Sequence, residues 1–105
     1  ARLNRIILRV LAQYGPLTIS DLRKRIKMLR DFRYTRYSVI HRRVNALQNE
    51  GFLEEVSLDE VRKSPIYGLT PRGKLAILLD QLDLDEVLRT ADVEKIAAIL
   101  SVLSG

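Results

Sequence analysis

The segment YTRYSVIHRRVNALQNEGFL, residues 34–53, predicts a basic helix that ends at a glycine and continues into a strand. Ile40, Val44 and Leu47 recur at helical spacing, which predicts one buried face. Gly51 supplies the left-handed residue with which many helices end. At about 100° per residue, the opposite face is small, polar and basic, and it consists of Thr35, Ser38, Arg42 and Asn45, flanked by Val39 and Ala46.

A helix with this outer face suits the major groove of DNA. Small residues permit a close approach to the bases, and an arginine such as Arg42 can bond the edge of a guanine through two N–H groups. The same pattern also fits an ordinary surface helix. The segments on both sides of it therefore carry part of the argument.

The composition is that of a single small domain. The chain has 105 residues, of which 47% are hydrophobic, enough for a core. Cysteine is absent, which excludes disulfides and thiolate metal sites and suits a cytoplasmic protein. No segment approaches the roughly 18 apolar residues of a membrane-spanning helix. The N-terminal residues lack a small-residue cleavage site, so we expect no signal peptide.

Basic residues are concentrated in the middle of the chain. The net charge is +5, and residues 23–43 hold nine of the eighteen basic residues against one acid, Asp31. After residue 75 the balance reverses, with six acidic residues against Arg89 and Lys95. This distribution predicts one side that faces a polyanion and a separate acidic side with another role. The alternative is the solvated surface of a charge-rich protein.

Two helices are predicted before the basic segment. The first, residues 2–13, ends at a Gly-Pro pair and leads into a very short strand at 17–18. The second, residues 19–29, begins at the N-cap Thr18, with Asp21 as its capping-box partner. Its buried face is expected to consist of Ile19, Leu22, Ile26 and Leu29.

A long basic turn at residues 30–34 then leads into the third helix. Phe32 is expected in the core, and so is one of the two tyrosines Tyr34 and Tyr37. Thr35 is expected to cap the third helix, which runs to about residue 50.

A β-hairpin follows the third helix. Strands are predicted at residues 52–57 and 66–69, joined by a polar loop at 57–65. Thr70 and Pro71 then begin another helix, as N-cap and first helical residue. The order of helix, short strand, two helices, two strands and helix is that of a winged helix-turn-helix. We therefore expect a mainly α fold with a small β-hairpin wing and C-terminal helices.

Three segments resemble winged-helix transcription regulators of the PadR, MarR and ArsR kind, especially those of archaea and bacteria. They are GPLTISDL at residues 15–22, SVIHRRVNALQNEGFLEE at 38–55 and IYGLTPRGK at 66–74, in the family's order and spacing. The resemblance covers about residues 3–79 and implies the fold, a double-stranded DNA target and usually a homodimer. The chain departs from the pattern in its longer, basic turn and in the acidic Asp59 and Glu60 of its wing loop.

Placing the third helix, about residues 35–50, in the major groove gives a set of candidate DNA contacts. Arg43 lies nearer the buried face and could instead pair with an acid, Thr35 could be a simple cap, and Arg62 fits either a minor groove or a solvated loop. The candidates are Lys24, Lys27, Arg33, Thr35, Arg36, Tyr37, Ser38, Val39, Arg42, Arg43, Asn45, Arg62 and Lys63.

The tail predicts a dimer contact. A short helix is predicted at residues 83–89, and a last helix from the cap Asp92 to residue 103. Residues 75–79 and 96–103 carry more apolar surface than one small core needs. The alternative is that the last helix folds back on its own domain. The expected interface consists of Leu75, Leu79, Val93, Ile96, Ala97, Leu100 and Leu103.

No pattern of an enzyme, metal site or cofactor site is visible. His41 is the only histidine and has no clustered partners. We therefore expect a homodimeric, sequence-specific DNA-binding transcription regulator without a cofactor, with residues 1–74 for DNA binding and 75–105 for dimerisation. Two alternatives stay open: a DNA-coating architectural or plasmid-segregation protein of low specificity, and a winged-helix module for protein–protein interaction.

Overall fold

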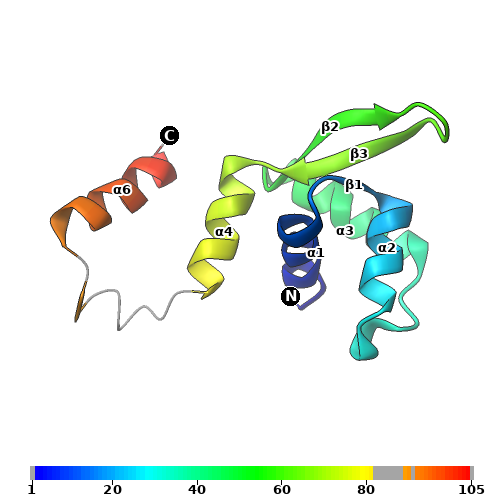
Figure 1. The fold of residues 1–105 in the computed structure, drawn as a ribbon, viewed down its shortest axis with the longest axis horizontal. Helices are drawn as coiled ribbons and strands as arrows, with labels where there is room; N and C mark the ends of the chain where they lie inside the picture. Colours follow the sequence, from blue (N-terminus) through cyan, green and yellow to red (C-terminus); the bar gives the residue numbers. More distant parts are fainter. Residues whose placement is uncertain (1, 82–88, 91, 105) are drawn as a thin grey trace.

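The computed structural model describes residues 2–81, 89–90 and 92–104. Figure 1 shows three helices gathered beneath a three-stranded sheet, with α4 beside α1 and α6 beyond α4. The elements in chain order are α1 (Arg2–Tyr14), β1 (Leu17–Thr18), α2 (Ile19–Lys27), the 3-10 helix η1 (Arg30–Phe32), α3 (Tyr37–Asn49), β2 (Leu53–Asp59), β3 (Ser64–Leu69), α4 (Pro71–Gln81) and α6 (Val93–Ser104).

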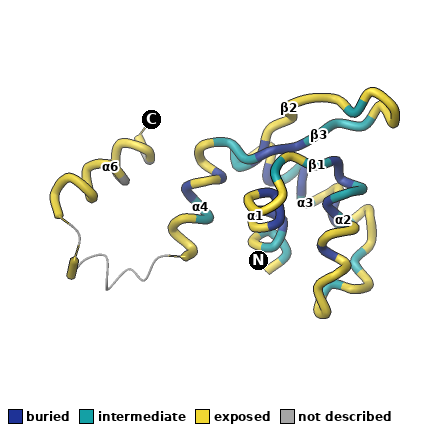
Figure 2. The backbone as a smooth tube through the Cα atoms, viewed as in Figure 1, coloured by how far each residue is buried: buried dark blue, intermediate teal, exposed yellow. Residues whose placement is uncertain are grey.

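The apolar faces of α1, α2 and α3 meet in one core, drawn dark blue in Figure 2. The helical spacing in the sequence predicted these faces because residues three and four apart lie on one side of a helix. The core is closed on the sheet side by Leu53 and Tyr67. Its helical members are Ile7, Leu8, Val10, Leu11, Ile19, Leu22, Ile26, Ile40, Val44 and Leu47.

The turn between α2 and α3 differs from the prediction. Helix α2 ends at Lys27, and Leu29, expected in the core, is 40% exposed. The chain turns into η1 at once, and Phe32 packs against the core in its place, as predicted. Tyr34 and Tyr37 are both exposed, so the prediction that one of them is buried is wrong.

The N-cap of helix α3 is one residue later than predicted and makes no side-chain cap. The residue at its N-cap is Arg36, which makes no side-chain bond to the helix. Thr35 cannot cap it, because its hydroxyl donates instead to the carbonyl of Phe32 at 2.8 Å. The other end is as predicted: Gly51 follows the C-cap with a left-handed φ of 85°.

The wing is longer and its loop shorter than predicted. The sheet has the order β1-β3-β2 with antiparallel pairing, and residues Asp59 and Ser64 still pair across the hairpin. Pro65 pairs with Leu58 although proline lacks an N–H. It is tolerated because β1 pairs only with Tyr67 and Ile66, so β3 has an unpaired edge at Pro65.

The C-terminal part consists of α4 and, beyond it, α6. Helix α6 begins as predicted, with the carboxylate of Asp92 accepting from the amide of Lys95 at 2.8 Å. It lies against α4 of the same chain, where an apolar hollow of about 350 Å³ is lined by Pro71, Lys74, Leu75, Leu78, Ala98 and Val102. All but the last residue of the helix predicted at 83–89 lie outside the described residues. No helix in the described ranges could span a membrane.

Thr70 joins the end of α3 to the start of α4. Its hydroxyl donates to the carbonyl of Gly51 and accepts from the amide of Gly73 at 3.1 Å, so it is the predicted N-cap of α4. Gly73 is buried, and a Cβ at this position would overlap the carbonyl oxygen of Phe52. That carbonyl cannot move freely, because it accepts from the amide of Thr70. The Thr-Pro-x-Gly sequence therefore has two roles. Thr70 caps α4, and Gly73 lets the backbone of α4 approach the backbone of Phe52 closely.

Replacing Gly73 by alanine should destabilise the fold by about 1–3 kcal/mol, because the added methyl group must displace the backbone of Phe52. Lys74→Ala, at an exposed position of the same helix, is the matched control and should change the free energy of unfolding by less than about 0.5 kcal/mol. Urea denaturation followed by circular dichroism measures both. Equal stability of the two variants would show that the backbone contact is not tight.

Candidate nucleic-acid interface

The outer face of α3 is set by burial of its inner face. Ile40 and Val44 are fully buried, and Ser38 and Arg42, on the opposite side, are exposed. Asn45 is half-buried, and its amide nitrogen lies 3.3 Å from Nδ1 of His41. The sequence therefore placed Ser38, Arg42 and Asn45 correctly relative to the core.

Other predicted contacts of this helix face the protein. The guanidinium of Arg43 donates to the side-chain oxygen of Asn4 at 2.9 Å and so links α3 to α1. Val39 and Thr35 are half-buried near the start of the helix. Arg23, which the sequence did not single out, donates from Nε to the carbonyl of Thr35 at 3.1 Å and holds the chain where α3 begins.

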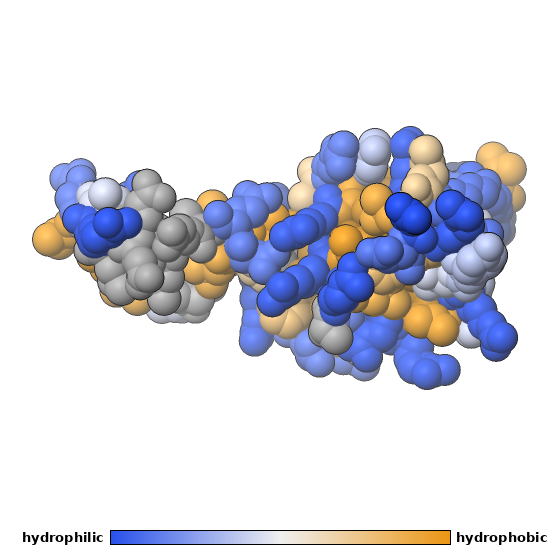
Figure 3. All heavy atoms as spheres, turned by 90° about the horizontal axis from the view of Figure 1, so that it is seen from below, coloured by the Kyte–Doolittle hydropathy of each residue, from blue (hydrophilic) through white to orange (hydrophobic). Residues whose placement is uncertain are grey.

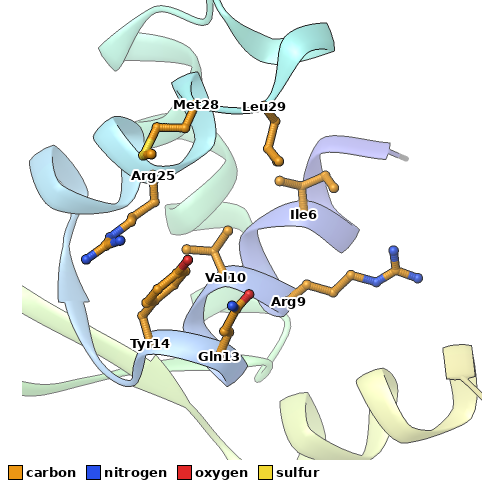
Figure 4. Close-up of a pocket in the computed structure, with 8 residues that line it drawn as sticks. All are labelled: Ile6, Arg9, Val10, Gln13, Tyr14, Arg25, Met28 and Leu29. Atoms are coloured by element: carbon orange, nitrogen blue, oxygen red, sulfur yellow. The ribbon is translucent and has the colours of Figure 1, made fainter.

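The basic residues of α2 divide between its two sides. Figure 4 shows Arg25 beside a hollow between α1 and α2, where its guanidinium lies 4.1 Å from the ring centre of Tyr14. Arg25 therefore belongs to the α1 side, whereas Arg23 reaches the start of α3. The predicted contacts Lys24 and Lys27 are both exposed, with Lys24 Nζ 3.9 Å from a carboxylate oxygen of Asp21.

Pairing with carboxylates separates the cations into two groups. On α1, Arg5 and Arg9 lie 3.5 and 2.7 Å from the carboxylate of Asp80 in α4, and Arg2 bonds Asp31 at 3.0 Å. A second group has no ion pair, hydrogen bond or ring contact within residues 2–81, 89–90 and 92–104. Within the basic segment, residues 23–43, this group consists of Lys27, Arg30, Arg33, Arg36 and Arg42.

This unpaired group is concentrated where α2 turns into α3. All five side chains are exposed, and Arg36 stands at the N-cap of α3, whose first turn contains no acid. Figure 3, seen from below Figure 1, shows hydrophilic side chains spread over the surface of the helical body, with hydrophobic ones between them. The positive end of the helix dipole adds to the charge of these cations. The one carboxylate of this turn, Asp31, is paired with Arg2 of α1 and forms no ion pair with these five cations.

The basic residues of the wing are engaged differently. The Arg62 guanidinium lies 3.3 and 3.4 Å from the two carboxylate oxygens of Asp21 in α2, and 3.6 Å from Asp59. Lys63, which has a left-handed φ of 56°, lies 3.7 Å from Glu60. Both predicted wing contacts, Arg62 and Lys63, are therefore ion-paired within the protein. In this they differ from the unpaired cations of the α2–α3 turn.

Asp59 organises the tip of the wing. Its Oδ1 accepts from the amides of Val61 and Arg62, each at 3.0 Å. The hydrogen bond from the Arg62 amide is the main cause that lowers the pKa of Asp59 below its ordinary value of 3.8, with a smaller contribution from the Arg62 charge. The carboxylate form is thus the one that holds the turn together.

The comparisons concern the fold. No family model and no curated protein matches the sequence. Among solved structures, H. salinarum RosR matches with a TM-score of 0.64 and 19% identity, over 99% of this chain and 90% of that chain. The chain has a winged helix-turn-helix fold. In the terms of this fold, α2 and α3 are the helix-turn-helix, and β2 and β3 are the wing, as the sequence predicted.

The described part of the winged helix offers no metal site, since no group of three or more His, Cys, Asp or Glu side chains gathers in it. The ring of His41 lies beside the ring of Tyr37 and the amide of Asn45. What the arrangement provides chemically is positive charge, polar side chains and an exposed helix face.

The wing turn should depend on pH through Asp59. Because the pKa of this carboxyl is lowered in the folded protein, its stabilising contribution is present above about pH 4 and is lost as the pH falls through the lowered pKa. In an NMR titration, the Val61 and Arg62 amide resonances should move together with a midpoint below 3.8. Asp59→Ala should abolish this titration. A midpoint at or above 3.8 in the native protein would contradict the hydrogen-bonded turn.

Proposed function

We propose that this chain is a sequence-specific, double-stranded-DNA-binding transcription regulator that acts as a homodimer in the cytoplasm. The observation that carries the proposal is the set of five exposed cations without a carboxylate partner among the described residues, between Lys27 and Arg42. An unneutralised cluster of this kind is unfavourable unless a polyanion faces it. The winged-helix fold places it around the helix whose outer face is polar and exposed.

Phosphate contacts would come from the turn and from α2. Arg30 and Arg33 precede the start of α3 and Arg36 is its N-cap, and the first turn of the helix contains no acid and has no side-chain cap. A helix start of this kind favours anions through its N–H groups and its dipole. Lys24 and Lys27, one and two turns into α2, extend the phosphate-binding surface. Each neutralised phosphate releases counterions and adds affinity irrespective of sequence.

Base readout would come from the outer face of α3. Arg42 is the only basic side chain at the centre of this face, and a guanidinium suits the acceptor edge of guanine. Ser38 and Asn45 lie one turn to either side of it and can bond base edges or phosphate. Tyr37 stands exposed at the start of the helix, where its hydroxyl can reach a phosphate. Arg43 is proposed as a support of the helix, since it already bonds Asn4.

The dimer is proposed to form through α6. Val93 is 82% exposed, and Ile96, Ala97 and Leu100 share its side of the helix, whereas Ala98 and Val102 face α4. Leu79 in α4 adds an exposed apolar side chain. Leu75 leaves the predicted interface because it is only 7% exposed in its own chain, and the side chain of Leu103 lies outside the described part.

Residues 1–74 would then bind DNA and residues 75–105 would form the dimer. Helix α4 runs without a break from Pro71 to Gln81 and its Asp80 pairs with α1, so this division separates roles within one packed unit. A two-fold dimer can present two copies of α3 to half-sites about one helical turn, roughly 34 Å, apart.

Arg42→Ala should reduce affinity for the operator by about 1–3 kcal/mol and relax the preference at one base position, because a base contact is lost. The matched control is Lys27→Ala, which should weaken binding to all DNA sequences alike. It should also reduce the slope of log K against log salt by about one, because one phosphate contact is lost. Fluorescence titration against the operator and its single-base variants measures both. Unaltered binding of folded Arg42→Ala would remove this residue from the interface.

The same experiments distinguish the alternative functions. A defined footprint on the DNA upstream of the gene supports a regulator, and continuous spreading along the DNA supports a coating or segregation protein. No DNA shift at low salt would leave a protein–protein module, but the unpaired cations of the α2–α3 turn have no evident use in such a module.

Ile96→Glu combined with Leu100→Glu should give a folded monomer, because both side chains lie on the exposed side of α6. Operator binding should weaken by about a hundredfold, since two half-sites are no longer linked. Ser101→Glu, on the same helix and exposed, is the control and should remain a dimer. Sedimentation of the native protein as a monomer at micromolar concentration would overturn the proposal, and an unfolded double variant would assign the helix to the core of the protomer.

A further inference from the structure

The wing of this protein is tied to α2 by one arginine. The pairing of Thr18 with Ile66 brings the start of β3 beside the N-cap of α2. From the wing tip, two nitrogens of the Arg62 guanidinium reach the two oxygens of Asp21 at 3.3 and 3.4 Å. Such a paired approach of a planar guanidinium to a carboxylate fixes orientation as well as charge.

The same guanidinium also serves the wing itself. Its Nε lies 3.6 Å from Oδ2 of Asp59, whose other oxygen is occupied by the amides of Val61 and Arg62. One positive charge is thus shared by two carboxylates on two different elements. Neither Asp59 nor Asp21 is fully exposed, with 22% and 34% of their side-chain surfaces accessible.

Both carboxylates are needed by the fold in the places where they lie. Asp59 holds the turn at the wing tip, and Asp21 stands in the first turn of α2, where a negative charge is favoured by the helix dipole. At the same time Asp21 lies on α2, which the proposed function brings to DNA, with Asp59 beside it on the other side of the Arg62 guanidinium, and Lys24, a proposed phosphate contact, is 3.9 Å from Asp21. An unneutralised carboxylate here would repel phosphate and hold back Lys24.

We infer that Arg62 is a positioning residue that bridges the wing to α2 and screens Asp21 and Asp59 from the DNA backbone. It is not, in this view, a side chain inserted into the minor groove. With Lys24, Arg62, Asp21 and Asp59 together, the edge formed by the wing tip and the start of α2 is neutral. Without Arg62 it carries one net negative charge. The screening role rests on the proposed function, whereas the bridge itself does not.

The bridge is tested in the free protein. Arg62→Gln should shift the side-chain carboxyl carbon resonances of both Asp21 and Asp59 in NMR spectra, because it removes the charge between them. Lys74→Gln, which removes one positive charge from an exposed position of α4, should shift neither. If Arg62→Gln leaves the Asp21 resonance unchanged, the bridge does not exist in solution.

The screening role is tested by charge rescue on DNA. Arg62→Gln should weaken binding by roughly threefold to tenfold at low salt, and less at high salt, because the repulsion is screened. Adding Asp21→Asn to Arg62→Gln should recover most of the loss, and Arg62→Lys should recover part of it. A direct contact of Arg62 with DNA predicts instead that the double variant stays as weak as Arg62→Gln alone, and this result would overturn the screening role.

The two levels of the proposal fail separately. If the native protein binds no DNA at low salt, the proposed function falls and the screening role falls with it, while the carboxyl resonances still decide the bridge. If the native protein binds DNA and the carboxyl resonances do not respond to Arg62→Gln, the function stands and the bridge is wrong.

Discussion

Burial of one face of α3 is the constraint on which the rest of the molecule depends. Ile40 and Val44 have no exposed surface and Leu47 has 2%, so this helix can rotate very little about its axis. That fixed rotation aims Arg42 and Ser38 outward and turns Arg43 toward Asn4.

The elements that follow α3 are held to it by backbone contacts. Gly51 reverses the chain, the amide of Thr70 bonds the Phe52 carbonyl, and Gly73 allows that carbonyl to approach the start of α4. The wing and α4 therefore take their positions from the end of α3. At the far end of the wing, Arg62 closes a second link by reaching Asp21 at the start of α2. Both ends of the hairpin are thus fixed to the helix-turn-helix.

Whether a cation of this molecule is neutralised depends on which carboxylates lie within reach of its side chain. Arg5 and Arg9 are within reach of Asp80, and Arg2 of Asp31, so the α1 side is largely neutralised. Arg33 and Arg36 project from the turn that holds Asp31, whose carboxylate pairs with Arg2 instead. Surface ion pairs of the first kind contribute little to stability. Their effect is to confine the uncompensated charge to the α2–α3 turn and the outer face of α3.

The sequence by itself determined what depends on neighbours along the chain: the helical faces, the caps Thr18 and Asp92, the end at Gly51 and the order of a winged helix. It failed for Thr35 and Leu29, because a bond to Phe32 and an early end of α2 replaced the local preference. Only the tertiary structure decided the partners of Arg43, Arg62 and Asp80. The bonds of Arg43 to Asn4, of Arg62 to Asp21 and of Arg9 to Asp80 join residues 39 to 71 positions apart, and such contacts follow from packing, which local periodicity does not encode.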